Sequence, residues 1–252
     1  MNLTPAKRKG LVMCSAAWFD GNRIFSSAGG ALGRRVMRWG AAGALGLWLS
    51  LSALPGVASA QTGESDPRTL NQQLLAAVRQ KDLAAVQGLL DRGADIESRN
   101  RFGDTALMSA VKRGDMALFE LAMSRGARVD VADVEGVTPV MTAAFEGRVP
   151  MLKAMLARKP PLDPMDRYGR TALIYAAGAG QMQSVQALVE AGAPVNQRAG
   201  QELTALMWAS GQGQDEIAQW LIARGADASL RDDRGMSAAQ MRAAASSPQA
   251  KP

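Results

Sequence analysis

The chain has 252 residues, 47% of them hydrophobic, which is enough to bury a core and argues against disorder throughout. It contains no His, which excludes His-ligated metal sites, Ser-His or Cys-His catalysis and a histidine pH switch. The net charge of +6 arises in residues 1–60, which hold seven of the 29 basic and one of the 23 acidic residues, leaving 22 of each. This balance argues against nucleic-acid binding, because phosphate recognition requires clustered positive charge.

The N-terminal segment has the order of a secretory signal peptide, which we place at residues 37–60. Arg34, Arg35 and Arg38 precede an uncharged apolar stretch at residues 40–54, and small residues lead up to Ala60. The apolar stretch has 15 residues, fewer than the ~20 that span a bilayer. We therefore expect cleavage after Ala60 and a periplasmic or secreted protein with no membrane attachment after cleavage.

The start of the chain leaves alternatives open. An uncleaved leader would make the protein a membrane-tethered scaffold. Residues 1–36 form an upstream extension that exceeds what a signal peptide needs, and a compact signal that begins at Met37 suggests a mis-called start. Arg34-Arg35 is a twin arginine, but Arg38 follows where that pathway usually has apolar residues, so both export routes stay open. The single cysteine, Cys14, lies in the extension, so the chain after residue 60 has no thiol for a disulfide.

From residue 68 onward the sequence repeats with a period of 33 residues. Glycine, threonine, an aliphatic residue and alanine recur at this spacing without insertions, and a period of this length indicates stacked units that bury one another's apolar faces. The glycine column comprises Gly103, Gly136, Gly169 and Gly235, with Glu202 as the gap. The other columns are Thr105, Thr138, Thr171, Thr204 and Ser237; Leu107, Val140, Leu173 and Leu206; and Ala110, Ala143, Ala176 and Ala209.

The repeated motif resembles that of the ankyrin-repeat family, whose unit opens its first helix with T-P-L-H-x-A. The matching segments here are Thr105-Ala106-Leu107-Met108-Ser109-Ala110, Thr138-Pro139-Val140-Met141-Thr142-Ala143, Thr171-Ala172-Leu173-Ile174-Tyr175-Ala176 and Thr204-Ala205-Leu206-Met207-Trp208-Ala209. The resemblance implies an all-α fold, a solenoid of stacked helix-turn-helix units joined by short β-hairpin-like loops. It covers residues 68–242 as an ankyrin-repeat domain of about five repeats plus a C-terminal cap, between a linker at 61–67 and a disordered tail at 243–252.

Two departures from the family pattern carry expectations of their own. The usual motif His is replaced by apolar residues, so apolar packing must substitute for the hydrogen bonds with which that His braces neighbouring units; these residues are Met108, Met141, Ile174 and Met207. One unit ends in Lys159-Pro160-Pro161 where the others have a helix-ending glycine, as at Gly93. We predict a local irregularity at Lys159 and a weak point in the stacking.

The sequence offers no constellation for catalysis, so we expect no enzyme, no cofactor and no metal site. The acidic pair Asp232-Asp233 is interpreted as a solvated hairpin tip. The segment Gly178-Ala179-Gly180 lacks the lysine and hydroxyl residue that a phosphate-binding loop requires.

What remains is a binding surface. In the ankyrin family, partners dock on the hairpin tips and on the exposed face of the first helices, which line a concave groove. Five of the seven aromatic residues after residue 60 fall at these positions, and aromatic residues with Arg dominate protein interfaces. The partner-binding residues predicted in this way are Arg101, Phe102, Lys112, Phe145, Arg167, Tyr168, Arg170, Tyr175, Trp208 and Arg234.

These expectations combine into one functional hypothesis. We expect a monomeric, non-catalytic interaction module that binds a protein or peptide in the periplasm, with no nucleic-acid partner. A secreted effector or inhibitor of an enzyme is the alternative besides the membrane-tethered scaffold. All three need only a groove, so the sequence does not separate them.

Overall fold

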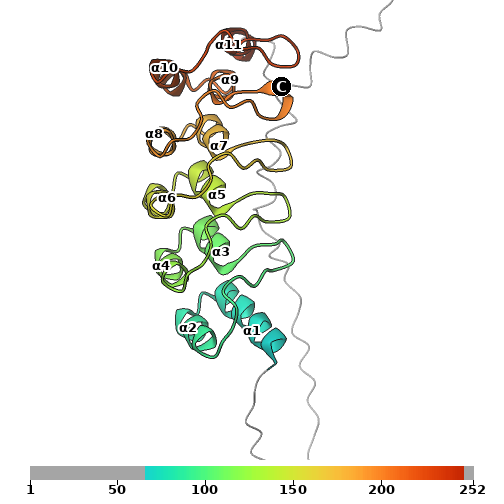
Figure 1. The fold of residues 1–252 in the computed structure, drawn as a ribbon, viewed down its shortest axis with the longest axis vertical. Helices are drawn as coiled ribbons and strands as arrows, with labels where there is room; N and C mark the ends of the chain where they lie inside the picture. Colours follow the sequence, from blue (N-terminus) through green and yellow to red (C-terminus); the bar gives the residue numbers. More distant parts are fainter. Residues whose placement is uncertain (1–65, 247–252) are drawn as a thin grey trace, which may run out of the picture. The chain divides into compact units, whose positions relative to one another are not determined.

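The computed structural model describes residues 66–246, which fold as an ordered stack of helix pairs (Figure 1). The inner layer consists of α1 (Pro67–Gln80), α3 (Ala106–Arg113), α5 (Pro139–Phe145), α7 (Ala172–Gly178), α9 (Ala205–Gly211) and α11 (Ala238–Ser246). The outer layer consists of α2 (Leu83–Asp91), α4 (Met116–Ser124), α6 (Val149–Leu156), α8 (Met182–Glu190) and α10 (Asp215–Ala223). From α1 to α9, each inner helix packs on the next inner helix and on its own outer helix, and α11 packs on α9. The all-α stack that the ankyrin resemblance implies is confirmed.

The repeated threonine is the N-cap of four inner helices, α3, α5, α7 and α9. The hydroxyls of Thr105, Thr138, Thr171 and Thr204 accept a hydrogen bond from the backbone N–H three residues later, which satisfies one of the donors left unpaired at a helix start. Pro139 occupies the first turn of α5, where the missing N–H is not needed. The sequence therefore sets the start of each inner helix locally.

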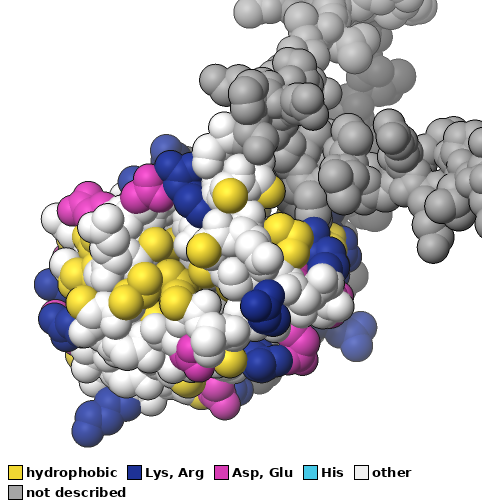
Figure 2. Space-filling view, turned by 90° about the horizontal axis from the view of Figure 1, so that it is seen from above, with side chains coloured by type: hydrophobic (Ala, Val, Ile, Leu, Met, Phe, Trp, Pro, Cys, Tyr) yellow, Lys and Arg dark blue, Asp and Glu magenta, His cyan; other side chains and the backbone are white. Residues whose placement is uncertain are grey.

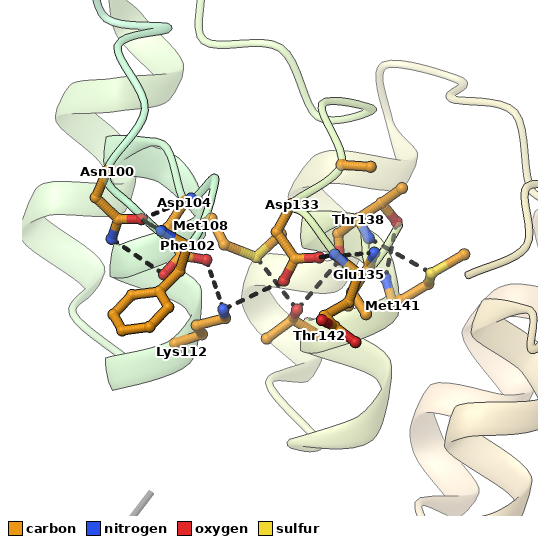
Figure 3. Close-up of polar contacts among 12 residues, drawn as sticks. Asn100, Phe102, Asp104, Met108, Lys112, Asp133, Glu135, Thr138, Met141 and Thr142 are labelled. Carbon is orange, nitrogen blue, oxygen red and sulfur yellow. Dashed lines mark hydrogen bonds and ion pairs between the residues drawn. The ribbon is translucent and has the colours of Figure 1, made fainter. Parts of the chain in front are cut away.

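The residues that replace the family's histidine lie in the core. Met108, Met141, Ile174 and Met207 are all buried, as expected for apolar packing at that position. Sulfur adds a polar link, since the Thr142 hydroxyl of the next unit lies 3.2 Å from the Met108 Sδ and equally close to the Thr138 carbonyl oxygen (Figure 3). A flexible thioether thus fills the core and also accepts part of a hydrogen bond between two units.

Some helix ends and hairpin tips have a left-handed backbone, and three non-glycine residues adopt it at columns where other units have glycine. Lys159 has φ of 52° where Gly93 and Gly126 have 91° and 82°, so the backbone keeps the left-handed conformation of this column and the predicted irregularity is limited to a lysine in place of glycine. The weak point in the stacking stays a prediction. Lys81 ends α1 with φ of 60° in the column of Gly114, and Glu202 has φ of 59° in the gap of the glycine column. A side chain in this conformation costs roughly 1–2 kcal/mol.

The two ends of the domain differ from the sequence-based boundaries. Helix α1 begins at Pro67, inside the predicted linker, because Asp66 caps it by accepting the Arg68 N–H at 3.1 Å. At the other end α11 continues to Ser246, so residues 243–246 are helical although we predicted a disordered tail from 243. Alanine favours helix, and Arg242 in this segment holds Asp215 of α10. The predicted extension, the signal peptide, most of the linker and residues 247–252 lie outside the described residues.

The α11 end of the stack exposes apolar side chains (Figure 2). Ile222 on α10 is 50% exposed, whereas its counterparts in the preceding units are partly buried against the core, namely Leu90, Met123, Leu156 and Val189. The difference arises because no further outer helix follows α10 within residues 66–246. None of the helices in this range combines the length and the apolar character needed to cross a bilayer.

The left-handed Lys159 gives a test of the local backbone assignment. Replacing Lys159 with Gly removes the steric cost of that conformation, and the greater freedom of Gly in the unfolded chain offsets part of the gain. We expect Lys159→Gly to raise the free energy of unfolding by about 0.5–1 kcal/mol. The matched control is Lys153→Gly within α6, which should lower it by about 1 kcal/mol. Urea denaturation followed by circular dichroism measures both, and destabilisation by Lys159→Gly would contradict the assignment.

Candidate protein-binding surface

One side-chain device shapes four of the five hairpin tips between the units. Asp133 shows the pattern, with its Oδ1 accepting the backbone N–H of Glu135 at 2.9 Å and of Val137 at 3.0 Å. The same pair of bonds, to the second and fourth residue that follow, forms at Asn100, Asp166 and Asp232. In the remaining tip, the fourth along the chain, Ala199 takes this position, and the chain there forms a short 3₁₀ turn, η3 (Gly200–Glu202).

This column of Asn and Asp residues overturns one expectation from the sequence. The Asp232 side chain has no exposed surface, so the interpretation of Asp232-Asp233 as a wholly solvated pair is wrong for its first member. Burial works to raise the pKa of Asp232, but hydrogen bonds from the Met236 N–H and from Arg234 outweigh it, so the pKa lies below its ordinary value. The signal that could have revealed these residues is the recurrence of Asn or Asp every 33 residues.

Backbone hydrogen bonds join each of the last four tips to the tip before it. The Val134 N–H donates to the Phe102 carbonyl at 3.1 Å, and the Arg167 N–H donates to the Glu135 carbonyl at 2.9 Å. Corresponding bonds run from Gly200 to Gly169 at 2.8 Å and from Asp233 to Gln201 at 3.2 Å. The tips therefore form a continuous row held at fixed register along one side of the stack.

Five of the predicted binding residues meet in an aromatic–arginine cluster, made of Phe145, Arg167, Tyr168, Arg170 and Tyr175. The rings of Phe145 and Tyr175 meet edge to face with centres 5.9 Å apart. The Arg170 guanidinium lies 4.5 Å from the ring centre of Tyr175 and 4.9 Å from that of Tyr168. Arg167 lies 4.7 Å from the ring centre of Tyr168. The cluster joins α5, α7 and the tip between them.

The polar groups of the cluster are bound within the protein. The Tyr175 hydroxyl donates to Asp166 Oδ2 at 2.6 Å, and burial together with this bond raises the pKa of Tyr175. Arg170 forms an ion pair with the buried carboxylate of Asp166 at 2.7 Å. Arg167 pairs with Glu135 of the preceding tip. The rings are thereby fixed in orientation, and Tyr168 stays 47% exposed.

The other predicted residues do not join the cluster. Lys112 extends between Asp104 of its own tip and Asp133 of the next, so its ammonium links two units (Figure 3). Arg234 pairs with Asp232 of its own turn. Arg101 and Phe102 lie at the first complete tip, where Arg101 stacks on a ring that is 51% exposed.

Trp208 extends the row of rings from α7 to α9. It is partly buried, and a side chain at Gly178 would place its Cβ 3.5 Å from the Trp208 Cε3. A Cβ at residue 178 would therefore meet the indole at an ordinary van der Waals distance, and the indole packs against α7. The position corresponding to Phe145 is occupied by Gly178 in α7 and by Gly211 in α9, so no second ring follows in that column.

The exposed aromatic rings of the described residues, Phe102, Phe145 and Tyr168, all lie on this face. Of the eight large hydrophobic side chains exposed in residues 66–246, four lie on the tips or on the adjoining end of an inner helix, namely Phe102, Val134, Phe145 and Tyr168. We call these four, with the partly buried Tyr175 and Trp208, the inner strip. The other four are Leu83, Met116, Met165 and Ile222.

Comparison with known proteins agrees with this architecture. The family described as ankyrin repeats in three copies matches residues 74–166 and 153–232, which together span more than half of the chain. The chain belongs to the ankyrin-repeat family. The crystal structure of EF0377, an ankyrin-repeat protein, is similar with a TM-score of 0.63 and 30% sequence identity, over 67% of this chain and 88% of that one. Among curated proteins, none matches the sequence significantly.

Family membership indicates the general role of this fold. Ankyrin repeats are generally protein-binding modules and are typically non-catalytic. Within the described ankyrin domain, no three His, Cys, Asp or Glu side chains converge as metal ligands would.

The buried turn carboxylate at Asp232 can be tested by comparing two substitutions. Asp232→Ala leaves two backbone N–H groups without their acceptor, so we expect the free energy of unfolding to fall by about 1–3 kcal/mol. Asp232→Asn keeps the acceptor, as Asn100 does naturally, and should cost less. Chemical denaturation at pH 7 measures the difference, and equal losses would contradict the turn assignment.

The same pair predicts a pH dependence. Because the folded pKa of Asp232 is lowered, the advantage of the parent over Asp232→Asn is full above the unfolded value of about 3.9 and disappears as the pH falls through the folded value. If the stability difference between the parent and Asp232→Asn instead grew as the pH is lowered, the pKa of Asp232 would be raised by folding and the assignment would be wrong.

Proposed function

We propose that this ankyrin-repeat protein is an exported, monomeric, non-catalytic interaction module that binds a protein or peptide through its inner strip. The observation that carries the proposal is the concentration of fixed, solvent-accessible rings on the row of tips and inner helices. Rigid aromatic side chains next to Arg are the usual anchors of protein interfaces, because they bury a large area with little loss of conformational freedom.

The proposed location rests on sequence alone. The order of positive end, short apolar stretch and small residues before Ala60 supports export to the periplasm, and a thiol-free chain after residue 60 is compatible with either redox environment. The family assignment supports a protein partner in general.

Affinity capture with matched variants tests the proposal. The tagged protein, expressed in its host, is used to capture partners that are then identified by mass spectrometry. We expect Phe145→Ala/Tyr168→Ala to lose the bound protein by at least about tenfold, since hot-spot rings commonly contribute that much. The control Met116→Ala/Ile222→Ala removes two apolar side chains of similar exposure outside the strip and should retain it.

Two readouts complete the experiment. Equal capture by the parent and by both variants would contradict the strip as the binding surface. Intact mass of the recovered protein reports export separately, because cleavage as proposed leaves a chain that begins at Gln61.

A further inference from the structure

The inner strip restricts the chemistry of its partner, and the inference drawn here rests on the proposed function. We propose that the strip binds an uncharged, proline- and aliphatic-rich segment in an extended, polyproline-type conformation that lies along the stack. Three observations carry this assignment, and each concerns a different property of the ligand.

The first observation concerns charge. Three arginines around the strip stand in internal pairs of opposite sign, with Arg167 on Glu135, Arg170 on Asp166 and Arg234 on Asp232. Lys112 likewise lies between two carboxylates. A strongly acidic or basic ligand would have to compete with these pairs, two of which involve a carboxylate with no exposed surface. The surface therefore complements a segment without net charge.

The second observation concerns the ligand's backbone. Peptides that join a protein as an added strand need free N–H and carbonyl groups on the receptor. At the tips that carry the strip, the backbone N–H groups of Val134, Arg167 and Tyr168 are already used by neighbouring tips or by a turn carboxylate. A polyproline segment suits such a surface, because it is recognised by its side chains on aromatic rings and proline has no N–H to satisfy.

The third observation concerns extent. Phe145, Tyr175 and Trp208 lie on the successive helices α5, α7 and α9, with Tyr168 at the tip between the first two. Packed helix axes are about 10 Å apart, so this row extends for roughly 20 Å. A polyproline segment rises 3.1 Å per residue, so about six or seven residues span the row. A ligand of this length makes contact along the surface and does not require an enclosed pocket.

Selection from a random 12-residue peptide library displayed on phage tests the proposal with the full-length protein as bait. Binders are counter-selected on Phe145→Ala/Tyr168→Ala, and Met116→Ala/Ile222→Ala is the matched control. We expect strip-dependent clones enriched in proline and aliphatic residues with no net charge. A synthetic peptide from this set should bind the double strip variant at least about tenfold more weakly, with less than about twofold change in affinity between 50 and 500 mM NaCl.

The opposing outcomes separate this inference from the proposed function. Strip-dependent clones that carry clustered acidic or basic residues, and whose affinity falls steeply with salt, would overturn the assigned chemistry while leaving the strip as a binding surface. Clones that bind the parent and the strip variant equally, or the absence of any enriched clone, would overturn both.

Discussion

The structure depends on the fact that a 33-residue helix pair cannot bury its own apolar face. In α3, for example, Leu107, Ala110 and Val111 have no exposed surface, because the units on either side cover them. Stacking is therefore required for folding, and it also sets the position of every tip relative to the next. The inner strip is a direct consequence of that packing, because residues one period apart fall into line.

The polar interactions refine what packing establishes. Buried turn carboxylates fix the shape of three tips, at Asp133, Asp166 and Asp232, and bonds between consecutive tips fix their register. The arginines of the cluster then hold the tyrosine rings by lying over their faces. A surface that is ordered before binding loses little conformational entropy when a partner docks, so a modest number of rings can give a useful affinity. Ion pairs that would be weak contributors to stability thus act here mainly to orient side chains.

Most of the fold could be read from the sequence because the period, the threonine caps and the aliphatic columns are local or strictly repeated signals. The alignment of Phe145, Tyr168 and Tyr175 on one face followed from the same register. Other features depend on tertiary contacts that the aligned repeat sequences do not show. The burial of Asp232 follows from the hydrogen bonds of a turn, and the ion pairs of Lys112 join two units. The helix at residues 243–246 is held by packing on α9 and by the contact between Arg242 and Asp215.

The most direct measurement of the central claim is site-specific photo-cross-linking in the host. Benzoylphenylalanine replaces Phe145 or Tyr168 on the inner strip, and Met116 or Ile222 outside it, with little change in exposed apolar character. Illumination should join a partner protein to the chain from the two strip positions and from neither of the others. A partner protein that cross-links from Met116 or Ile222 but not from Phe145 or Tyr168 would contradict the account.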